Sequence, residues 1–172
     1  RALDRNLYDV VPIGITNAIE DVKVMAWKAF QVPSIIGTRM DEEVSIVTKR
    51  VGEMAIGLDL PMPKNVATEV GRVVTMFREL REGQTLDGKT ALMVPSGTLS
   101  TAEAIAVMVG GLSQAAFFSN GTLNADGIAP NILGAVLKDP VQDKAVLAEY
   151  LETVVKKRRD YADYYSVLTE IL

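Results

Sequence analysis

Apolar residues recur at three- and four-residue steps along most of the 172-residue chain, which predicts a mainly helical protein. The clearest stripe runs from about Asn65 to Glu82, with charged residues between apolar positions at Val66, Val70, Val73, Val74, Phe77 and Leu80. Another helix should begin at Asp41-Glu42-Glu43, because acidic side chains are favoured at a helix N-terminus, and should end at Gly57. Its buried face would carry Val44, Val47, Val51 and Ala55.

Capping signals predict the helices that follow. Ser100-Thr101-Ala102-Glu103 is a capping box, and the positions behind it are apolar almost all round up to Phe117, so this helix should be the central and most buried one. Asn124 leads into a short helix that carries Ile128, Ile132, Leu133, Val136 and Leu137. Asp139-Pro140 starts a last amphipathic helix, from Val141 to about Leu172, which could break near Arg159.

The first forty residues follow a different pattern. Leu7 to Ile13 reads as a short strand, in which Pro12 indicates an edge or a strand end. A helix should follow from Asn17 to Gln31, and Trp27 in it reads as a packing residue. The predicted fold class is therefore mainly α, a bundle of five to six helices with a short N-terminal strand, divided into residues 1–40 and 41–172.

Composition narrows the function. The net charge is −4, and the longest basic run is Lys156-Lys157-Arg158-Arg159, which argues against a nucleic-acid partner. The chain has no cysteine and no histidine, so it lacks thiolate chemistry, the commonest zinc ligand and the commonest general base, which argues against a metal site and a self-contained hydrolase. No apolar run approaches a membrane span and no signal-peptide pattern is present, so we expect a cytoplasmic protein without a membrane partner. A start at Arg1 rather than Met suggests part of a longer protein.

Gly83 to Thr90 matches the G-x-x-x-x-G-K-[ST] pattern of nucleotide-binding P-loops. In a P-loop, Lys89 would reach the β- and γ-phosphates and the Thr90 hydroxyl would bind Mg²⁺. A P-loop joins a buried strand to a helix N-terminus, whereas this octapeptide follows a helix and runs through a short apolar segment into a turn at Pro95. We therefore predict a solvated loop at this place.

Three stretches of the chain together resemble the C-terminal lid of bacterial MoxR-type AAA+ ATPases, a branch associated with partner proteins that carry a von Willebrand factor A domain. They are Val73–Gly83, Pro95–Ile105, and Gly134–Pro140 followed by Glu149–Val155. The similarity covers roughly Asp41 to Arg159. It implies an α/β nucleotide-binding core ahead of a helical lid, and a homo-oligomeric, hexameric ring. It also implies that the full-length protein binds ATP and Mg²⁺, whereas this part alone binds neither. ATP hydrolysis would drive the remodelling of partner proteins.

The resemblance carries over few functional residues. Many AAA+ lids have an arginine near the start of their third helix that touches the γ-phosphate, which implies that Ser100 and Thr101 lie near the nucleotide. Ala102 occupies the arginine's place, so a direct contribution of the lid to hydrolysis is in doubt. A plain capping box is the alternative interpretation of the same residues.

At the N-terminus, Arg1 to Asn6 resembles the segment that closes many AAA+ cores. Its arginine reaches the nucleotide of the neighbouring subunit, where a permanently charged guanidinium stabilises the transferring phosphoryl group. Arg5 is the candidate for this catalytic role, and Arg1 is a second one. Asn6 and Leu7 depart from the aromatic residue expected after the arginine, and a surface arginine is the alternative.

Two other functions stay open at this point. A stand-alone helical adaptor without enzymatic activity would bind a protein through the apolar surface around Met25, Trp27 and Phe30, or through the C-terminal helix. A small independent NTPase would use Gly83 to Thr90. The residues encoded before Arg1 separate the first possibility from the ATPase lid, because a lid needs a P-loop core upstream.

Overall fold

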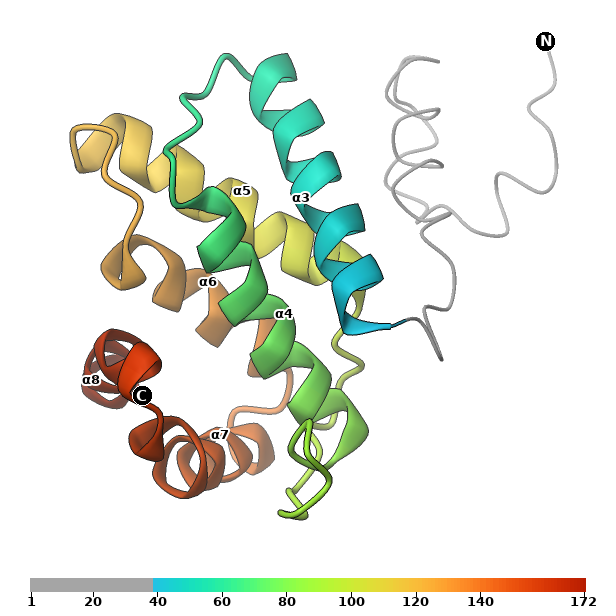
Figure 1. The fold of residues 1–172 in the computed structure, drawn as a ribbon. Coiled ribbons are helices and arrows are strands. Elements are labelled where there is room, and N and C mark those ends of the chain that lie inside the picture. Colours follow the sequence, from blue (N-terminus) through green and yellow to red (C-terminus); the bar gives the residue numbers. More distant parts are fainter. Residues whose placement is uncertain (1–38) are drawn as a thin grey trace, which may run out of the picture. The chain divides into compact units, whose positions relative to one another are not determined.

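The computed structural model describes residues 39–172. The chain divides into two units between Thr38 and Arg39, so the expected strand at Leu7–Ile13 and the helix at Asn17–Gln31 lie outside the described residues. The described unit contains six α-helices, two short 3-10 turns and no strand (Figure 1). The helices are α3 (Met40–Gly57), α4 (Val66–Glu82), α5 (Thr101–Phe118), α6 (Ala125–Val136), α7 (Gln142–Thr153) and α8 (Ala162–Ile171). The mainly helical fold class is confirmed.

Helices α3 and α4 agree with the pattern that predicted them. The first turn of α3 carries three acidic residues, and its fully buried apolar residues are Val47, Val51 and Ala55. Helix α4 ends at Glu82 and is capped by Gly83, whose φ of 66° lies in the left-handed region that glycine adopts without strain. A Cβ at this position would lie 2.9 Å from Cγ2 of Val94, so glycine also makes room for the returning chain.

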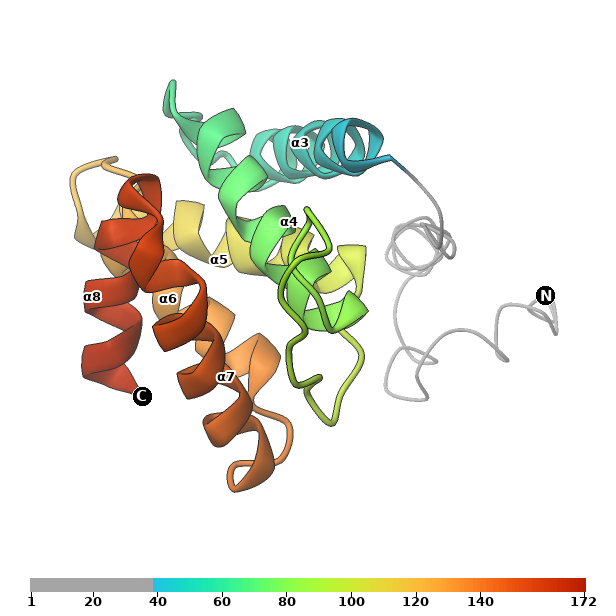
Figure 2. The same ribbon diagram turned by 60° about the horizontal axis from the view of Figure 1, so that its bottom comes forward.

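Helix α5 packs against α3, α4 and α6, which gives it the central place that its apolar sequence predicts (Figure 2). The capping box is confirmed, because the Glu103 amide donates to Ser100 Oγ at 3.2 Å and the Ser100 amide donates to Glu103 Oε2 at 2.7 Å. The last turn differs from the prediction. Phe117 and Phe118 are 76% and 80% exposed, because the chain reverses just beyond them and only Ala115 of that turn faces the bundle.

Among the described helices, α5 has the length and mean hydropathy of a helix that could cross a membrane, which the sequence pattern did not suggest. Half of it is buried inside the bundle. The packing against three other helices accounts for much of its apolar character.

The long C-terminal helix is broken more widely than predicted. Helix α7 ends at Thr153, and two 3-10 turns, Val155–Lys157 and Arg159–Tyr161, separate it from α8. The break lets α8 fold back so that it packs against α6 and α7 (Figure 1). Asp139 closes the turn that leads into α7, since its Oδ1 accepts hydrogen bonds from the amides of Val141 and Gln142 at 2.9 and 3.1 Å.

Candidate functional site

The Gly83–Thr90 octapeptide has the flanks that the sequence predicted. It follows α4 directly, and the next helix begins only at Thr101. The octapeptide turns back on itself: Gln84 and Ala91 form an isolated antiparallel bridge, and the Thr85 amide donates to the Thr90 carbonyl at 2.9 Å. The strand-loop-helix unit of a P-loop is therefore absent from this part of the described chain.

The amides of this loop bond to oxygen atoms of the protein. Leu86 N donates to Glu79 Oε1 at 2.9 Å, and Gly88 N to the Thr85 carbonyl at 2.8 Å. Lys89 N donates to Asp87 Oδ1 at 3.1 Å. The Asp87 carboxylate also accepts a hydrogen bond from the Thr85 hydroxyl, and these bonds hold the pKa of Asp87 below its usual value. A phosphate would find the amides engaged and an ionised carboxylate beside the lysine, which is the reverse of an anion-binding loop.

We therefore expect titration of the chain with Mg-ATP to give no binding in the micromolar range. Lys89→Ala should leave the calorimetric trace unchanged, and so should Lys157→Ala, which removes another exposed lysine. Micromolar binding that is lost in Lys89→Ala and kept in Lys157→Ala would contradict this expectation and restore the P-loop interpretation.

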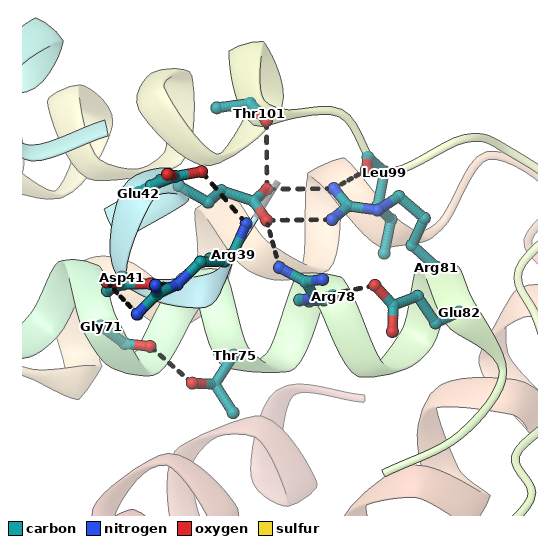
Figure 3. A network of polar contacts seen from close by, with 11 residues as sticks. Arg39, Asp41, Glu42, Gly71, Thr75, Arg78, Arg81, Glu82, Leu99 and Thr101 are labelled. Atoms are coloured by element: carbon teal, nitrogen blue, oxygen red, sulfur yellow. Dashed lines mark hydrogen bonds and ion pairs between the residues drawn. The ribbon is translucent and has the colours of Figure 1, made fainter. Parts of the chain in front are cut away.

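A buried carboxylate near the start of α3 joins three helices (Figure 3). Glu43 is 2% exposed, and its two oxygens accept a forked pair of hydrogen bonds from Arg81 at 3.1 Å each. Oε1 also accepts the Thr101 hydroxyl at 3.1 Å, and Arg78 Nη1 lies 3.5 Å from Oε2. Arg81 donates in addition to the Leu99 carbonyl at 3.2 Å. The first turn of α3, the end of α4 and the start of α5 are thus fixed to one another.

This network includes one of the two residues predicted to lie near nucleotide. The Thr101 side chain points to Glu43, and Ser100 takes part in the capping box. The Ser100 contact agrees with the capping interpretation, the Thr101 contact joins α5 to α3, and a nucleotide contact by either residue stays a prediction. Arg5 lies outside the described residues.

A cavity of about 340 Å³ lies between α5 and α6, beside the first turns of α5. Small side chains such as Ala106 line it, together with Asn131 of α6. At its edge, Lys138 Nζ lies 3.2 Å from Glu103 Oε1. The opposite charges of this pair neutralise each other, so the cavity has no net charge that would select an ion.

Two more buried carboxylates lie on α4, and the sequence analysis missed both. Glu79 is fully buried and accepts a fork of two hydrogen bonds from Arg158, at 2.6 and 2.9 Å, together with the Tyr150 hydroxyl at 2.7 Å. Glu69 accepts the Tyr164 hydroxyl at 2.8 Å. Burial is the main cause, and the neighbouring carboxylate the second, that raises the pKa of Tyr150 and of Tyr164 well above the usual value. Helix α4 is therefore tied to α7, to the break after α7 and to α8.

A fourth buried carboxylate, Asp143 near the start of α7, accepts four hydrogen bonds. The donors are Ser96 N at 2.7 Å, Ser96 Oγ at 2.8 Å, Lys138 N at 2.8 Å and Asp139 N at 2.7 Å. Burial alone would raise the pKa of Asp143, but these four bonds outweigh it and lower the pKa to about 2. Asp143 thus holds together two of the stretches on which the family resemblance rests.

Within residues 39–172, no group of three or more carboxylate, thiol or imidazole side chains is placed to hold a metal ion. Each of the four buried carboxylates is satisfied by hydrogen-bond donors of the protein itself. The four buried carboxylates therefore join the helices of the described part of the chain to one another.

In residues 39–172, six packed helices without a sheet, joined by four buried carboxylates, define a helical bundle domain. A family model described as "YehL-like AAA+ ATPase C-terminal domain" matches residues 41–168. The chain belongs to this family and therefore carries the C-terminal domain of an AAA+ ATPase. No curated protein matches the chain, and no solved structure does either. The predicted AAA+ lid is confirmed at this level.

Proposed function

We propose that this domain is the lid of a MoxR-type AAA+ ATPase, in the branch associated with partners that carry a von Willebrand factor A domain. It couples ATP binding and hydrolysis in an upstream core to the assembly of a hexameric ring and to the remodelling of a partner protein. The observation that carries this proposal is the match to an AAA+ C-terminal family over residues 41–168.

The way in which the helices are joined supports a role in transmission. A lid passes on the state of a nucleotide by moving as a rigid body against its core. Glu43, Glu79 and Asp143 each bond at least two segments that are distant in sequence, so force applied to one helix reaches the others. Satisfied buried networks of this kind resist internal deformation.

The nucleotide contacts follow from the same proposal. The upstream core holds ATP and Mg²⁺, and Ser100 and Thr101 lie close to the bound nucleotide when the lid closes. Ala102 supplies no charge to the γ-phosphate, so the stabilising arginine comes from elsewhere, with Arg5 acting on the neighbouring subunit as the candidate.

The test uses the full-length protein with its natural upstream residues. We expect it to hydrolyse ATP, measured by phosphate release. We also expect it to assemble in a nucleotide-dependent way, measured by analytical ultracentrifugation. A version that ends after residue 40 should keep binding of a fluorescent ATP analogue but lose both activities. Lys89→Ala in the full-length protein should keep both, because the Gly83–Thr90 loop is not the phosphate site. The proposal fails if no P-loop is encoded upstream, or if the shortened protein assembles and hydrolyses ATP like the full-length one.

One observation favours the adaptor as a second candidate. Large apolar side chains are exposed near the α3–α4 connection, at Ile56 and Leu58, and at the end of α5, at Phe117 and Phe118. The α3–α4 connection is joined to the α5–α6 connection by a hydrogen bond from the Asn65 side chain to the Leu123 carbonyl at 2.8 Å. Exposed apolar clusters are typical of protein-binding surfaces. The surface around Trp27 that the sequence suggested lies outside the described residues.

A further inference from the structure

We propose that Glu79 makes the Gly83–Ala91 loop and the C-terminal segment Arg158–Ile171 into one cooperative unit, so that the order of each segment depends on the other. This coupling goes beyond the proposed function and does not depend on it, because all of its contacts lie within the described residues.

On one side, Glu79 anchors the loop. Its Oε1 accepts the Leu86 amide at 2.9 Å, and its own carbonyl accepts the Gln84 amide at 3.2 Å. Leu86 is 46% exposed and the Lys89 side chain is 82% exposed, so the tip of the loop is open to contact from outside. The bond to Leu86 N ties this tip to the core of the bundle.

On the other side, Glu79 anchors the break that leads into α8. Arg158 lies between the two 3-10 turns, and its guanidinium forms the fork with Glu79 at 2.6 and 2.9 Å. The same guanidinium lies 5.5 Å from the ring centre of Tyr161, a buried residue next to the start of α8. The ring of Tyr161 in turn contacts that of Tyr164, with 6.4 Å between ring centres.

The two sides share atoms of one carboxylate. Oε1 accepts both the Leu86 amide and Nη2 of Arg158, and the side chain is fully buried, so the loss of one partner leaves a buried charge with fewer donors. If Arg158 leaves, the carboxylate is an unpaired buried charge that reorients toward solvent and pulls away from the loop. By thermodynamic reciprocity, loosening of the loop must weaken the docking of α8 to the same extent.

Amide hydrogen exchange on the whole 172-residue chain tests this coupling. Arg158→Met should speed exchange of the Leu86 amide by about tenfold or more, in step with the amides of α8, because both segments then open as one unit. Lys157→Met removes the neighbouring exposed cation and should change neither segment. Faster exchange in α8 with an unchanged Leu86 amide would overturn the proposal.

The reciprocal experiment starts from the loop. Thr85→Val keeps the shape of the side chain but removes the hydroxyl that donates to Asp87 and accepts from the Thr90 amide. We expect faster exchange in α8, whereas Leu86→Ala, which keeps the bonded amide, should leave α8 unchanged. An α8 that exchanges at the wild-type rate in Thr85→Val, although the loop has loosened, would refute the coupling. If Arg158→Met does not fold, Arg158→Lys keeps the charge without the fork and should give smaller, still parallel increases in both segments.

Discussion

Replacement of Glu79 by alanine should lower the free energy of unfolding by about 3–5 kcal/mol, the range for loss of one partner from a buried ion pair. The variant leaves the part-buried Arg158 guanidinium without its carboxylate and the buried Tyr150 hydroxyl without its acceptor. The Leu86 amide loses its partner as well. Urea denaturation followed by circular dichroism measures the difference.

Glu82→Ala is the matched control, since it removes a carboxylate from the same helix. Glu82 is 36% exposed and pairs with Arg78 at 2.7 Å, so its loss should cost less than about 1 kcal/mol. If Glu79→Ala and Glu82→Ala lower the free energy of unfolding equally, burial of the Glu79 carboxylate does not make it more important for stability. The double variant Glu79→Leu with Arg158→Met should recover part of the lost stability, because it removes the unpaired charge and adds apolar contacts.

The helices were predictable because their signals are local. The capping box at Ser100 and Glu103 spans four residues, and the stripe of α4 recurs within a few turns, so each can be read without knowledge of the tertiary fold. The exposure of Phe117 was not predictable in this way. An apolar side chain near a helix end is buried only if another element covers it, and that depends on where distant segments pack.

The carboxylate network escaped the sequence analysis for the same reason. Glu79 and Arg158 are 79 residues apart, and Glu43 and Thr101 are 58 apart, so no local spacing links them. One signal was present: Glu69 lies three residues after Val66 and four before Val73, on the apolar stripe of α4. A charged residue at such a position indicates a buried partner, which proves to be the Tyr164 hydroxyl.

The Gly83–Thr90 loop shows how context decides the meaning of a motif. Its residues match a phosphate-binding pattern, but the predicted elements on either side of it are not the strand and helix of a P-loop. In the structure, the Leu86 and Lys89 amides donate to Glu79 and Asp87. Both carboxylates accept amides that a P-loop would direct at phosphate. The sequence could exclude the P-loop from the flanks alone. It could not reveal that the loop is fastened to the core by Leu86, because the bonded group is a backbone amide that has no sequence signature.

Asp143 joins two of the separate stretches on which the family resemblance rests. Its carboxylate closes the turn at Lys138 and Asp139 and, through Ser96, fixes the segment that leads into α5. The turn before α7 and the chain before α5 are therefore one structural feature, although 47 residues separate Ser96 from Asp143. Substitution of Asp143 would leave the donors of both segments without their acceptor.

Asp143→Asn should accordingly destabilise the domain by about 2–3 kcal/mol at pH 7, because an amide has one acceptor oxygen and places an N–H₂ group against a donor. The loss should depend on pH. The folded-state pKa of about 2 lies below the ordinary value of 3.8, so the ionised carboxylate stabilises the fold above pH 4, and this contribution is lost as the pH falls toward 2. A shift of this size corresponds to about 2 kcal/mol, and solvent near the exposed residues Ser96 and Asp139 should reduce it to about 1 kcal/mol.

Urea denaturation at pH 7, 4, 3 and 2 therefore should show the stability gap between wild type and Asp143→Asn narrowing by about 1 kcal/mol below pH 4. Asp126→Asn, which neutralises an exposed acid in the first turn of α6, serves as the control and should give no comparable narrowing. A gap that stays constant from pH 7 to pH 2 would mean that Asp143 is held by shape rather than by its charge. The hydrogen bonds from Ser96, Lys138 and Asp139 would then stabilise a neutral side chain as much as an ionised one. The short donor distances at both Asp143 oxygens argue against this, because short bonds of this kind are typical of a charged acceptor.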